Sequence, residues 1–324
     1  MDSALIDAYL RRLGYERPPG PTGATLDVLR ELQLRHLRTV PFENLAVHLG
    51  EEIVLEEERL LDKVVGARRG GFCYELNGAF GALLGALGFD VTLLAARVYA
   101  DEGRLGIPYD HLALRVRTVD AGVWLADVGF GAHSHWPLAF EARGEQRDPV
   151  GTFRIVEAGP DAAGRRGGGG GGDGGSDKET QETTQQEAAE AERDTADSGT
   201  VDVGELVDVG DPGAADLDVL MDGRAQYRLE TRPRVLGDFV AGAWWHSTSP
   251  ASHFTQSLVC SRVTEDGGRI TLSGRTFKVT GADGTREERE IGTDEEVLAV
   301  YRERFGIALD EVPTVRGAGQ WRRE

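Results

Sequence analysis

Arg69-Gly70-Gly71-Phe72-Cys73-Tyr74-Glu75-Leu76-Asn77 is the stretch on which the prediction of the fold depends. Two glycines precede Cys73 and an apolar run of small residues follows it, which predicts a tight turn that leads into a helix. Cys73 is then expected in the first turn, where unpaired backbone N–H groups and the helix dipole stabilise a thiolate. Free cysteine is also a common buried apolar residue. The glycine turn and the polar neighbours favour the reactive interpretation.

A base for this thiol is predicted from two strand-like segments, residues 111–117 and 123–129, which can pair across a three-residue loop. In that pairing His111 lies opposite Asp127 on one sheet face, with Cβ atoms about 5 Å apart. A slip of two residues keeps them diagonal and within reach, whereas a slip of one residue separates them. A carboxylate fixes the tautomer of an imidazole and raises its basicity. Cys73, His111 and Asp127 are therefore the candidate nucleophile, base and orienting group.

The order of elements predicts an α+β fold. Apolar residues recur at helical spacing in residues 5–13, 26–37 and 60–65, before the cysteine helix. Strand patterns follow from residues 91, 111 and 123, and further strands are expected over 241–263 and 269–279. A last helix is expected over residues 294–305, with Thr293 and Glu296 as a capping box and Gly306 as the stop.

Residues 157–215 interrupt this pattern and are predicted to be a disordered insertion. The segment is rich in glycine and acidic residues, and no aromatic residue occurs between Phe153 and Tyr227. The formal net charge is −19, but residues 161–222 alone carry 17 acidic against 4 basic side chains. The rest of the chain is nearly balanced, and no basic surface suited to nucleic acid is expected.

Cysteine usage and hydropathy narrow the class of protein further. Two cysteines are too few for a disulfide scaffold, and no Cys-x-x-Cys or His-Glu-x-x-His motif predicts a metal site. No apolar run reaches the length of about 20 residues that spans a bilayer, and the N-terminus lacks the pattern of a signal peptide. A cytoplasmic protein with no membrane partner is expected. Cys260, in an apolar strand pattern, is expected in the core.

Five stretches together resemble the arylamine N-acetyltransferase family, in their order and in their spacing. They are Pro41-Phe42-Glu43-Asn44-Leu45, the stretch from Arg69 to Asn77, His111-Leu112, Asp127-Val128-Gly129-Phe130-Gly131, and the Ser-Thr-Ser-Pro turn from Ser247. The resemblance implies a helical domain over residues 1–88, an antiparallel β-barrel domain over 89–222 and an α/β lid over 223–324. It also implies a cysteine-protease-like Cys-His-Asp core at the junction of the first two domains.

The same resemblance implies acetyl transfer from acetyl-CoA, as co-substrate, to an aromatic amine or hydrazine. Cys73, His111 and Asp127 match the family's triad. Phe42 and Phe130 match its aromatic pocket wall, and Gly129 and Gly131 are expected to allow close backbone approach. The N–H groups of Phe72 and Cys73 are expected to form an oxyanion hole. Thr248, Ser249 and Ser252 are candidate contacts of the coenzyme, and His246 and His253 flank this polar turn.

Three other functions remain open at this point. An amide synthase of the same fold would use Cys73 to release a polyketide chain as a lactam. A cysteine protease or a transglutaminase-like enzyme would use the same order of Cys, His and Asp. A non-enzymatic binding module would carry a Cys73 of ordinary reactivity.

Overall fold

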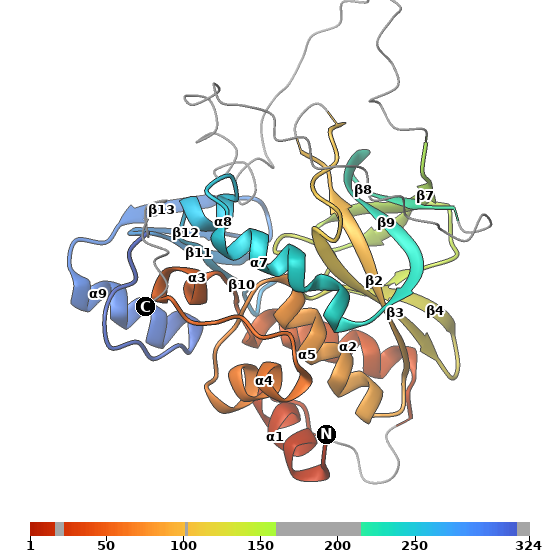
Figure 1. Cartoon of the computed structure of the whole chain (residues 1–324), viewed down its shortest axis with the longest axis horizontal. Helices are drawn as coiled ribbons and strands as arrows, with labels where there is room; N and C mark the ends of the chain where they lie inside the picture. Colours follow the sequence, from red (N-terminus) through yellow and green to blue (C-terminus); the bar gives the residue numbers. More distant parts are fainter. Residues whose placement is uncertain (17–22, 101–102, 160–214, 316–324) are drawn as a thin grey trace, which may run out of the picture.

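The computed structural model describes residues 1–16, 23–100, 103–159 and 215–315, and the insertion predicted at 157–215 lies mostly outside this part of the chain. Figure 1 shows three regions: helices from the first third of the chain, an eight-stranded sheet, and a five-stranded sheet with the last helix. The α+β class predicted from the sequence is confirmed. In the described residues no helix has the length and apolar character needed to cross a membrane.

Amphipathic helices build the first region around the helix that begins at Cys73. Its elements are α1 (Ser3–Arg12), α2 (Leu26–Thr39), α3 (Leu45–Leu49), α4 (Glu57–Leu61), a π-helical turn (Asp62–Gly66) and α5 (Cys73–Ala86). From Cys73 to Gly81 every residue of α5 is buried. A helix that is apolar all round belongs inside a protein, which explains why α5 lies between the other helices and the neighbouring sheet.

The eight-stranded sheet is antiparallel throughout and forms a nearly closed barrel. Its strand order is β5-β4-β3-β2-β9-β8-β7-β6. The strands are β2 (Asp90–Val98), β3 (His111–Thr118), β4 (Gly122–Ala126), β5 (Leu138–Ala139), β6 (Gln146–Asp148), β7 (Gly151–Glu157), β8 (Leu217–Met221) and β9 (Arg224–Arg234). One apolar cluster, which includes Phe130, Phe153 and Tyr227, fills its interior.

The second sheet pairs one short strand from the helical region with four strands from the last part of the chain. Its order is β1-β10-β11-β12-β13, with β1 (Phe42–Glu43), β10 (Cys260–Val263), β11 (Arg269–Ser273), β12 (Thr276–Thr280) and β13 (Arg286–Glu290). The last helix, α9 (Asp294–Val300), continues as a π-helical turn to Phe305. Thr293 caps it with Glu296 as its partner, and Gly306 ends it with φ 71°, so the predicted capping box and stop are confirmed. Cys260 is fully buried, as expected.

The β3–β4 pairing differs from its predicted register by two residues. The prediction places Leu114 opposite Trp124, whereas the structure pairs Leu114 with Ala126. Thr118 pairs with Gly122, so the three-residue loop covers residues 119–121. Side chains alternate with a period of two, so a shift of two residues keeps His111 and Asp127 on one face.

The strand predicted from residue 241 is wrong, because this segment is the helix α7 (Val240–Thr248). Its apolar residues do not alternate: Gly242, Ala243 and His246 are buried, while Trp244 is 65% exposed. A short 3-10 turn (Leu236–Phe239) precedes α7, and α8 (His253–Gln256) follows it. Figure 1 shows α7 between the two sheets and above α5.

The β8–β9 hairpin bears on the expected domain boundary at 222–223. That boundary falls in the turn between β8 and β9, and both strands belong to the eight-stranded sheet. β9 also pairs with β2, with Leu229 opposite Ala96. We therefore propose that the barrel domain extends through Arg234 and that the third domain begins after it.

Candidate active site

Cys73 is the first residue of α5 and is 5% exposed. Strand β1 runs beside the turn that precedes it, and the Glu43 N–H donates to the Gly71 carbonyl at 2.9 Å. A Cβ on Gly70 would lie 1.8 Å from the Pro41 carbonyl oxygen, so only glycine fits at this position. The two sequence motifs around Pro41 and Cys73 are therefore one structural unit.

His111 and Asp127 lie at hydrogen-bonding distance, as predicted. His111 Nε2 is 2.7 Å from Asp127 Oδ2, and both side chains are buried. Burial alone would lower the pKa of His111, but the Asp127 carboxylate and then Cys73 raise it to about 10. Burial would raise the pKa of Asp127, but His111 outweighs it and lowers this pKa to about 2. The raised pKa of His111 and the lowered pKa of Asp127 favour an imidazolium paired with a carboxylate.

The Asp127 carboxylate accepts three further hydrogen bonds. Asn77 Nδ2 donates to Oδ1 at 2.8 Å, the Gly129 N–H donates to Oδ1 at 2.9 Å, and the Tyr227 hydroxyl donates to Oδ2 at 3.3 Å. Asn77 Oδ1 also accepts the Val128 N–H at 2.9 Å. No role was predicted for Asn77 or Tyr227 from the sequence. Asn77 lies one turn after Cys73 on α5, a spacing that could have indicated a shared face.

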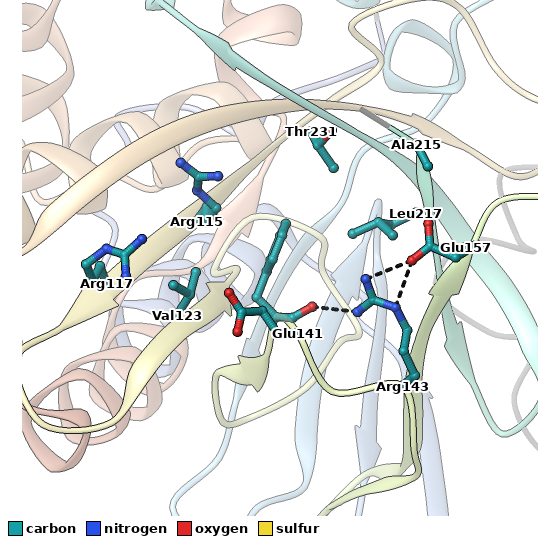
Figure 2. A pocket seen from close by; sticks show the side chains of 10 residues that line it. Arg115, Arg117, Val123, Glu141, Arg143, Glu157, Ala215, Leu217 and Thr231 are labelled. Atoms are coloured by element: carbon teal, nitrogen blue, oxygen red, sulfur yellow. Dashed lines mark hydrogen bonds and ion pairs between the residues drawn. The ribbon is translucent and has the colours of Figure 1, made fainter. Parts of the chain in front are cut away.

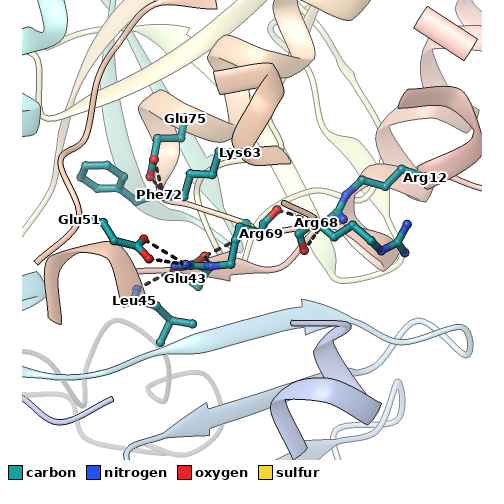
Figure 3. Close-up of polar contacts among 10 residues, drawn as sticks. Arg12, Glu43, Leu45, Glu51, Lys63, Arg68, Arg69, Phe72 and Glu75 are labelled. Atoms are coloured by element: carbon teal, nitrogen blue, oxygen red, sulfur yellow. Dashed lines mark hydrogen bonds and ion pairs between the residues drawn. The ribbon is translucent and has the colours of Figure 1, made fainter. Parts of the chain in front are cut away.

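A network of charged side chains, of which Glu43, Arg69 and Glu75 are buried, lies under the cysteine turn (Figure 3). Lys63 Nζ is 2.5 Å from Glu75 Oε1, and Arg69 Nε is 2.9 Å from Glu43 Oε1. Burial would lower the pKa of Lys63, but the carboxylates of Glu75 and Glu43 raise it, so the lysine stays charged. Arg69 also reaches Glu51 at 3.0 Å. These ion pairs fix the backbone on the N-terminal side of Cys73.

The expected oxyanion hole is only partly available. The Phe72 N–H donates to Glu75 Oε2 at 3.3 Å, because Glu75 lies at the N3 position of α5 and reaches back to the cap. The prediction is therefore wrong for the Phe72 N–H, which is already bonded in this structure. The Cys73 N–H, in the first helical turn, has no intrahelical partner and remains as a candidate donor.

Of the two predicted aromatic residues, Phe130 contacts the triad directly, and Phe42 lies beside the turn that precedes Cys73. Phe130 contacts the His111 ring edge to face, with ring centroids 5.1 Å apart. Phe42 pairs with Gly71 and contacts Phe254, with ring centroids 6.0 Å apart. A Cβ on Gly129 would lie 2.7 Å from Cys73 Cα, which bears out the close approach expected there.

Gly131 differs from this expectation. A Cβ there would meet open space, and its φ of 87° is the feature that favours glycine. Its carbonyl accepts from Arg269 Nη2 at 2.5 Å, which connects this loop to β11.

The side chains of the three candidate coenzyme residues form hydrogen bonds with other residues of their own segment. Ser252 is fully buried, and its hydroxyl lies 3.3 Å from His246 Nδ1 and accepts the Phe254 N–H at 3.3 Å. Thr248 and Ser249 are half-buried, and the Thr248 hydroxyl donates to the Trp244 carbonyl at 2.6 Å. A direct contact of the Ser252 hydroxyl with coenzyme is therefore not supported by this geometry.

Two surface hollows lie apart from the triad. One, of about 350 Å³, is on the barrel and is lined by Arg115, Arg143 and Glu157 among others (Figure 2). Arg143 and Glu157 pair there at 3.0 Å, so the guanidinium is already neutralised. The other, of about 300 Å³, lies over the charged network of Lys63, Arg69 and Glu75.

In the described residues no group of three His, Cys, Asp or Glu side chains could hold a metal ion.

A buried thiol, an imidazolium and an oriented carboxylate form a constellation suited to nucleophilic acyl transfer through sulfur. The thiol attacks an acyl carbon, and the imidazole moves protons to and from the reacting groups. Several classes of enzyme use this chemistry, and the geometry alone does not select among them.

Comparison with known proteins selects among these classes. A family model described as N-acetyltransferase matches residues 25–314 of the chain. The arylamine N-acetyltransferase of Mycolicibacterium smegmatis is 31% identical over 316 residues, which cover 95% of this chain and 93% of that protein. The arylamine N-acetyltransferase of Escherichia coli K12 is 27% identical over 308 residues, or 95% of this chain and 90% of that protein.

Solved structures agree with the sequence relatives. The M. smegmatis arylamine N-acetyltransferase has a TM-score of 0.69 at 30% identity, with 95% of this chain and 93% of that chain covered. The Mycobacterium marinum enzyme in complex with CoA has a TM-score of 0.67 at 28% identity, with 93% and 92% covered.

Proposed function

The chain belongs to the arylamine N-acetyltransferase family, and from that premise we propose that it moves an acetyl group from acetyl-CoA to the nitrogen of an arylamine or hydrazine through an acetyl-Cys73 intermediate. The family identifies the protein as an acyltransferase. The ping-pong route through Cys73, and the roles of His111 and Asp127, are the parts that we propose.

In the first half-reaction the Cys73 thiolate attacks the carbonyl carbon of the acetyl thioester. The negative charge on the carbonyl oxygen is stabilised by the Cys73 N–H at the positive end of α5. The C–S bond to coenzyme A then breaks. The imidazolium of His111 gives a proton to the departing thiolate, so free coenzyme A leaves and a neutral imidazole remains.

In the second half-reaction the amine nitrogen attacks the acetyl carbon of the thioester on Cys73. His111 takes a proton from the nitrogen, and the C–S bond to Cys73 breaks. The thiolate and the imidazolium are thereby restored, and the acetylated amine leaves. Asp127 stabilises the charged form of His111 in the free enzyme before and after the cycle, because it stays ionised when buried beside the ring.

The observation that carries the proposal is the position of His111 between Cys73 and Asp127. The ring bonds Asp127 through Nε2 at 2.7 Å, and the thiol of Cys73 contributes to the raised pKa of the same ring. A structural cysteine gains nothing from a charged imidazole beside it, whereas a nucleophilic thiol is activated by one.

The first prediction tests the acetyl-enzyme directly. The protein is mixed with acetyl-CoA without amine, and intact-mass and peptide mass spectrometry are expected to find one acetyl group, on Cys73. Cys73→Ser keeps a nearly isosteric side chain, but its hydroxyl stays protonated, so acetyl transfer should fall by at least about a hundredfold with the fold intact. Cys260→Ser is the matched control and should keep the activity, since Cys260 is buried in β10.

Three other results would contradict the proposal. Activity of the Cys73→Ser variant within about tenfold of the parent would remove Cys73 as the nucleophile. Labelling by a peptide electrophile without any acetylation from acetyl-CoA would indicate a protease. Acylation only by a long acyl chain on a carrier would indicate an amide synthase of the same fold.

A further inference from the structure

A second histidine–carboxylate pair, formed by His246 and Asp110, lies close to Cys73. His246 of α7 places its Nε2 2.8 Å from Oδ1 of Asp110, the residue immediately before β3. The two side chains are 3% and 11% exposed. The pair therefore joins a helix of the third domain to the segment that carries the proposed base.

Each polar atom of this pair already has a partner. Asp110 Oδ2 accepts the Val98 N–H at 3.1 Å, and His246 Nδ1 lies 3.3 Å from the Ser252 hydroxyl. Both ring nitrogens of His246 are thus engaged. The ring is consequently not a second base, and its contribution has to come through Asp110.

Asp110 contacts Cys73 through its backbone. The Cys73 thiol lies 3.9 Å from the Asp110 carbonyl oxygen, which also accepts the Tyr74 hydroxyl at 3.1 Å. Tyr74 donates to the Tyr109 carbonyl as well, at 2.7 Å. Tyr109 has a φ of 59°, a left-handed conformation that is strained for a residue with a side chain. Such a turn persists only where its surroundings hold it.

The charge on Asp110 gives the pair an electrostatic role. A carboxylate near a thiolate disfavours the thiolate by repulsion between like charges. The pKa of Tyr74 is raised well above its usual value, by burial first and then by Cys73 and Asp110, which places both groups against the same hydroxyl. In the structure the two oxygens of this carboxylate are bonded to His246 and to the Val98 N–H.

We propose that His246 is a positioning residue for Cys73: it holds the Asp110 carboxylate away from the thiolate while the Asp110 carbonyl stays against Sγ. Ser252 supports this role by fixing the His246 ring, rather than by contacting coenzyme. The inference rests on the proposed role of Cys73 as the nucleophile.

The test is the rate at which iodoacetamide alkylates Cys73 at about pH 6.5, measured by peptide mass spectrometry on the full chain. His246→Leu frees the carboxylate and should slow alkylation roughly tenfold, the effect of about one pKa unit. His246→Gln keeps a donor near the position of Nε2 and should stay within about threefold of the parent. In the double variant His246→Leu/Asp110→Asn the charge is gone, and the rate should return to within about threefold of the parent.

His48→Leu is the matched control. His48 is also a buried histidine, but its Nε2 bonds the Ser257 carbonyl, at the C-terminal end of α8, at 3.0 Å. Its variant should alkylate at the parent rate. Steady-state kinetics on the same set should show the loss in kcat for acetyl transfer, in the same order as the alkylation rates.

The outcomes separate the two proposals. If Cys73 of the parent alkylates no faster than an ordinary thiol, the proposed function fails. If the parent is reactive but the folded His246→Leu variant is unaffected, or its double variant is no faster than the single one, the positioning role is overturned. If His246→Leu does not fold, Asp110→Asn alone decides: a rate at or above that of the parent supports the charge argument, and a tenfold slower rate contradicts it.

Discussion

Asp127 accepts four hydrogen bonds, and this concentration of donors on one carboxylate organises the site at the scale of single residues. The donors come from His111, Asn77, Tyr227 and the Gly129 backbone. A carboxylate that accepts several hydrogen bonds stays ionised even when it is buried. This arrangement therefore favours the imidazolium form of His111, on which the proposed role of Cys73 as nucleophile depends.

The pH dependence of stability should report this ion pair. The pKa of His111 is raised to about 10 in the folded protein, so its stabilising contribution is complete below the unfolded value of about 6.5. The contribution is lost as the pH rises from there through about 10. At the acid end the pKa of Asp127 is lowered to about 2, so its contribution is lost as the pH falls from about 4 toward 2.

Asp127→Asn should accordingly cost most stability at near-neutral pH and progressively less toward pH 10. Urea denaturation of the parent and the variant at about pH 6, 8 and 10 measures the difference. Asp120→Asn, in the loop between β3 and β4, is the control and should show no such trend. A difference between parent and Asp127→Asn that stays constant over this range would contradict the assignment of the ion pair.

The prediction of individual site residues succeeded where it depended only on which face of a strand a residue occupies. It failed where it needed contacts between residues far apart in the sequence. His111 and Asp127 share a sheet face in any register that is shifted by an even number of residues, so the two-residue error did not matter. Asn77 was within reach of prediction, one helical turn after Cys73. Tyr227 lies 100 residues from Asp127, and no local pattern indicates that pairing.

At the scale of elements, α7 shows why an apolar segment was assigned to the wrong class. Its residues are small or aromatic, and a short run of this composition fits either a strand or a buried helix. The deciding contact is tertiary: a Cβ on Gly242 would lie 2.7 Å from the Tyr109 carbonyl oxygen and 2.8 Å from the Tyr74 hydroxyl. The helix forms here because it packs its backbone onto the turn beside Cys73.

Gly242→Ala should therefore destabilise the protein by about 1–3 kcal/mol and reduce the turnover number, since it displaces the Tyr109 turn. Gly85→Ala is the matched control, because Gly85 also lies in a helix but is exposed, and a Cβ there meets open space. The control should stabilise the protein by about 0.5–1 kcal/mol, the ordinary gain of alanine over glycine in a helix. Thermal unfolding and steady-state kinetics measure both effects. Equal effects of the two substitutions would show that the close approach at Gly242 has no consequence.

At the scale of the whole molecule, the acidic insertion enters and leaves the barrel at one rung of a strand pair. Glu157 of β7 pairs with Leu217 of β8, and the Ala158 N–H donates to the Asp216 carbonyl at 2.8 Å. The two ends of the insertion are therefore held together by the barrel itself. The described residues on either side of the insertion form the paired strands β7 and β8.

Replacing residues 160–212 by a short Gly-Ser bridge should leave the enzyme folded, with kcat/KM within about twofold of the parent. Loop closure costs about 0.6 kcal/mol for each doubling of loop length, so a shorter loop does not lower the stability. As a control, the longer deletion of residues 155–219 removes the buried Ile155 and Val219 from the barrel interior and should destabilise it. A large fall in turnover with an unchanged melting transition in the shorter deletion would assign the segment a role at the site.

The pairing of β9 with β2 has a consequence for the order in which the protein can assemble on the ribosome. Cys73, His111 and Asp127 have all been synthesised by position 127. Strand β9, which pairs with β2 and brings Tyr227 to Asp127, is synthesised about 100 residues later. At translation rates of about 5–20 residues per second, that interval lasts about 5–20 s. During this interval the nascent chain exposes the edge of β2. It also carries the proposed nucleophile and base without the strand that brings Tyr227 to Asp127. The insertion accounts for more than half of the residues made in that interval. Its length therefore largely determines the delay between synthesis of β2 and synthesis of β9, the strand that pairs with it.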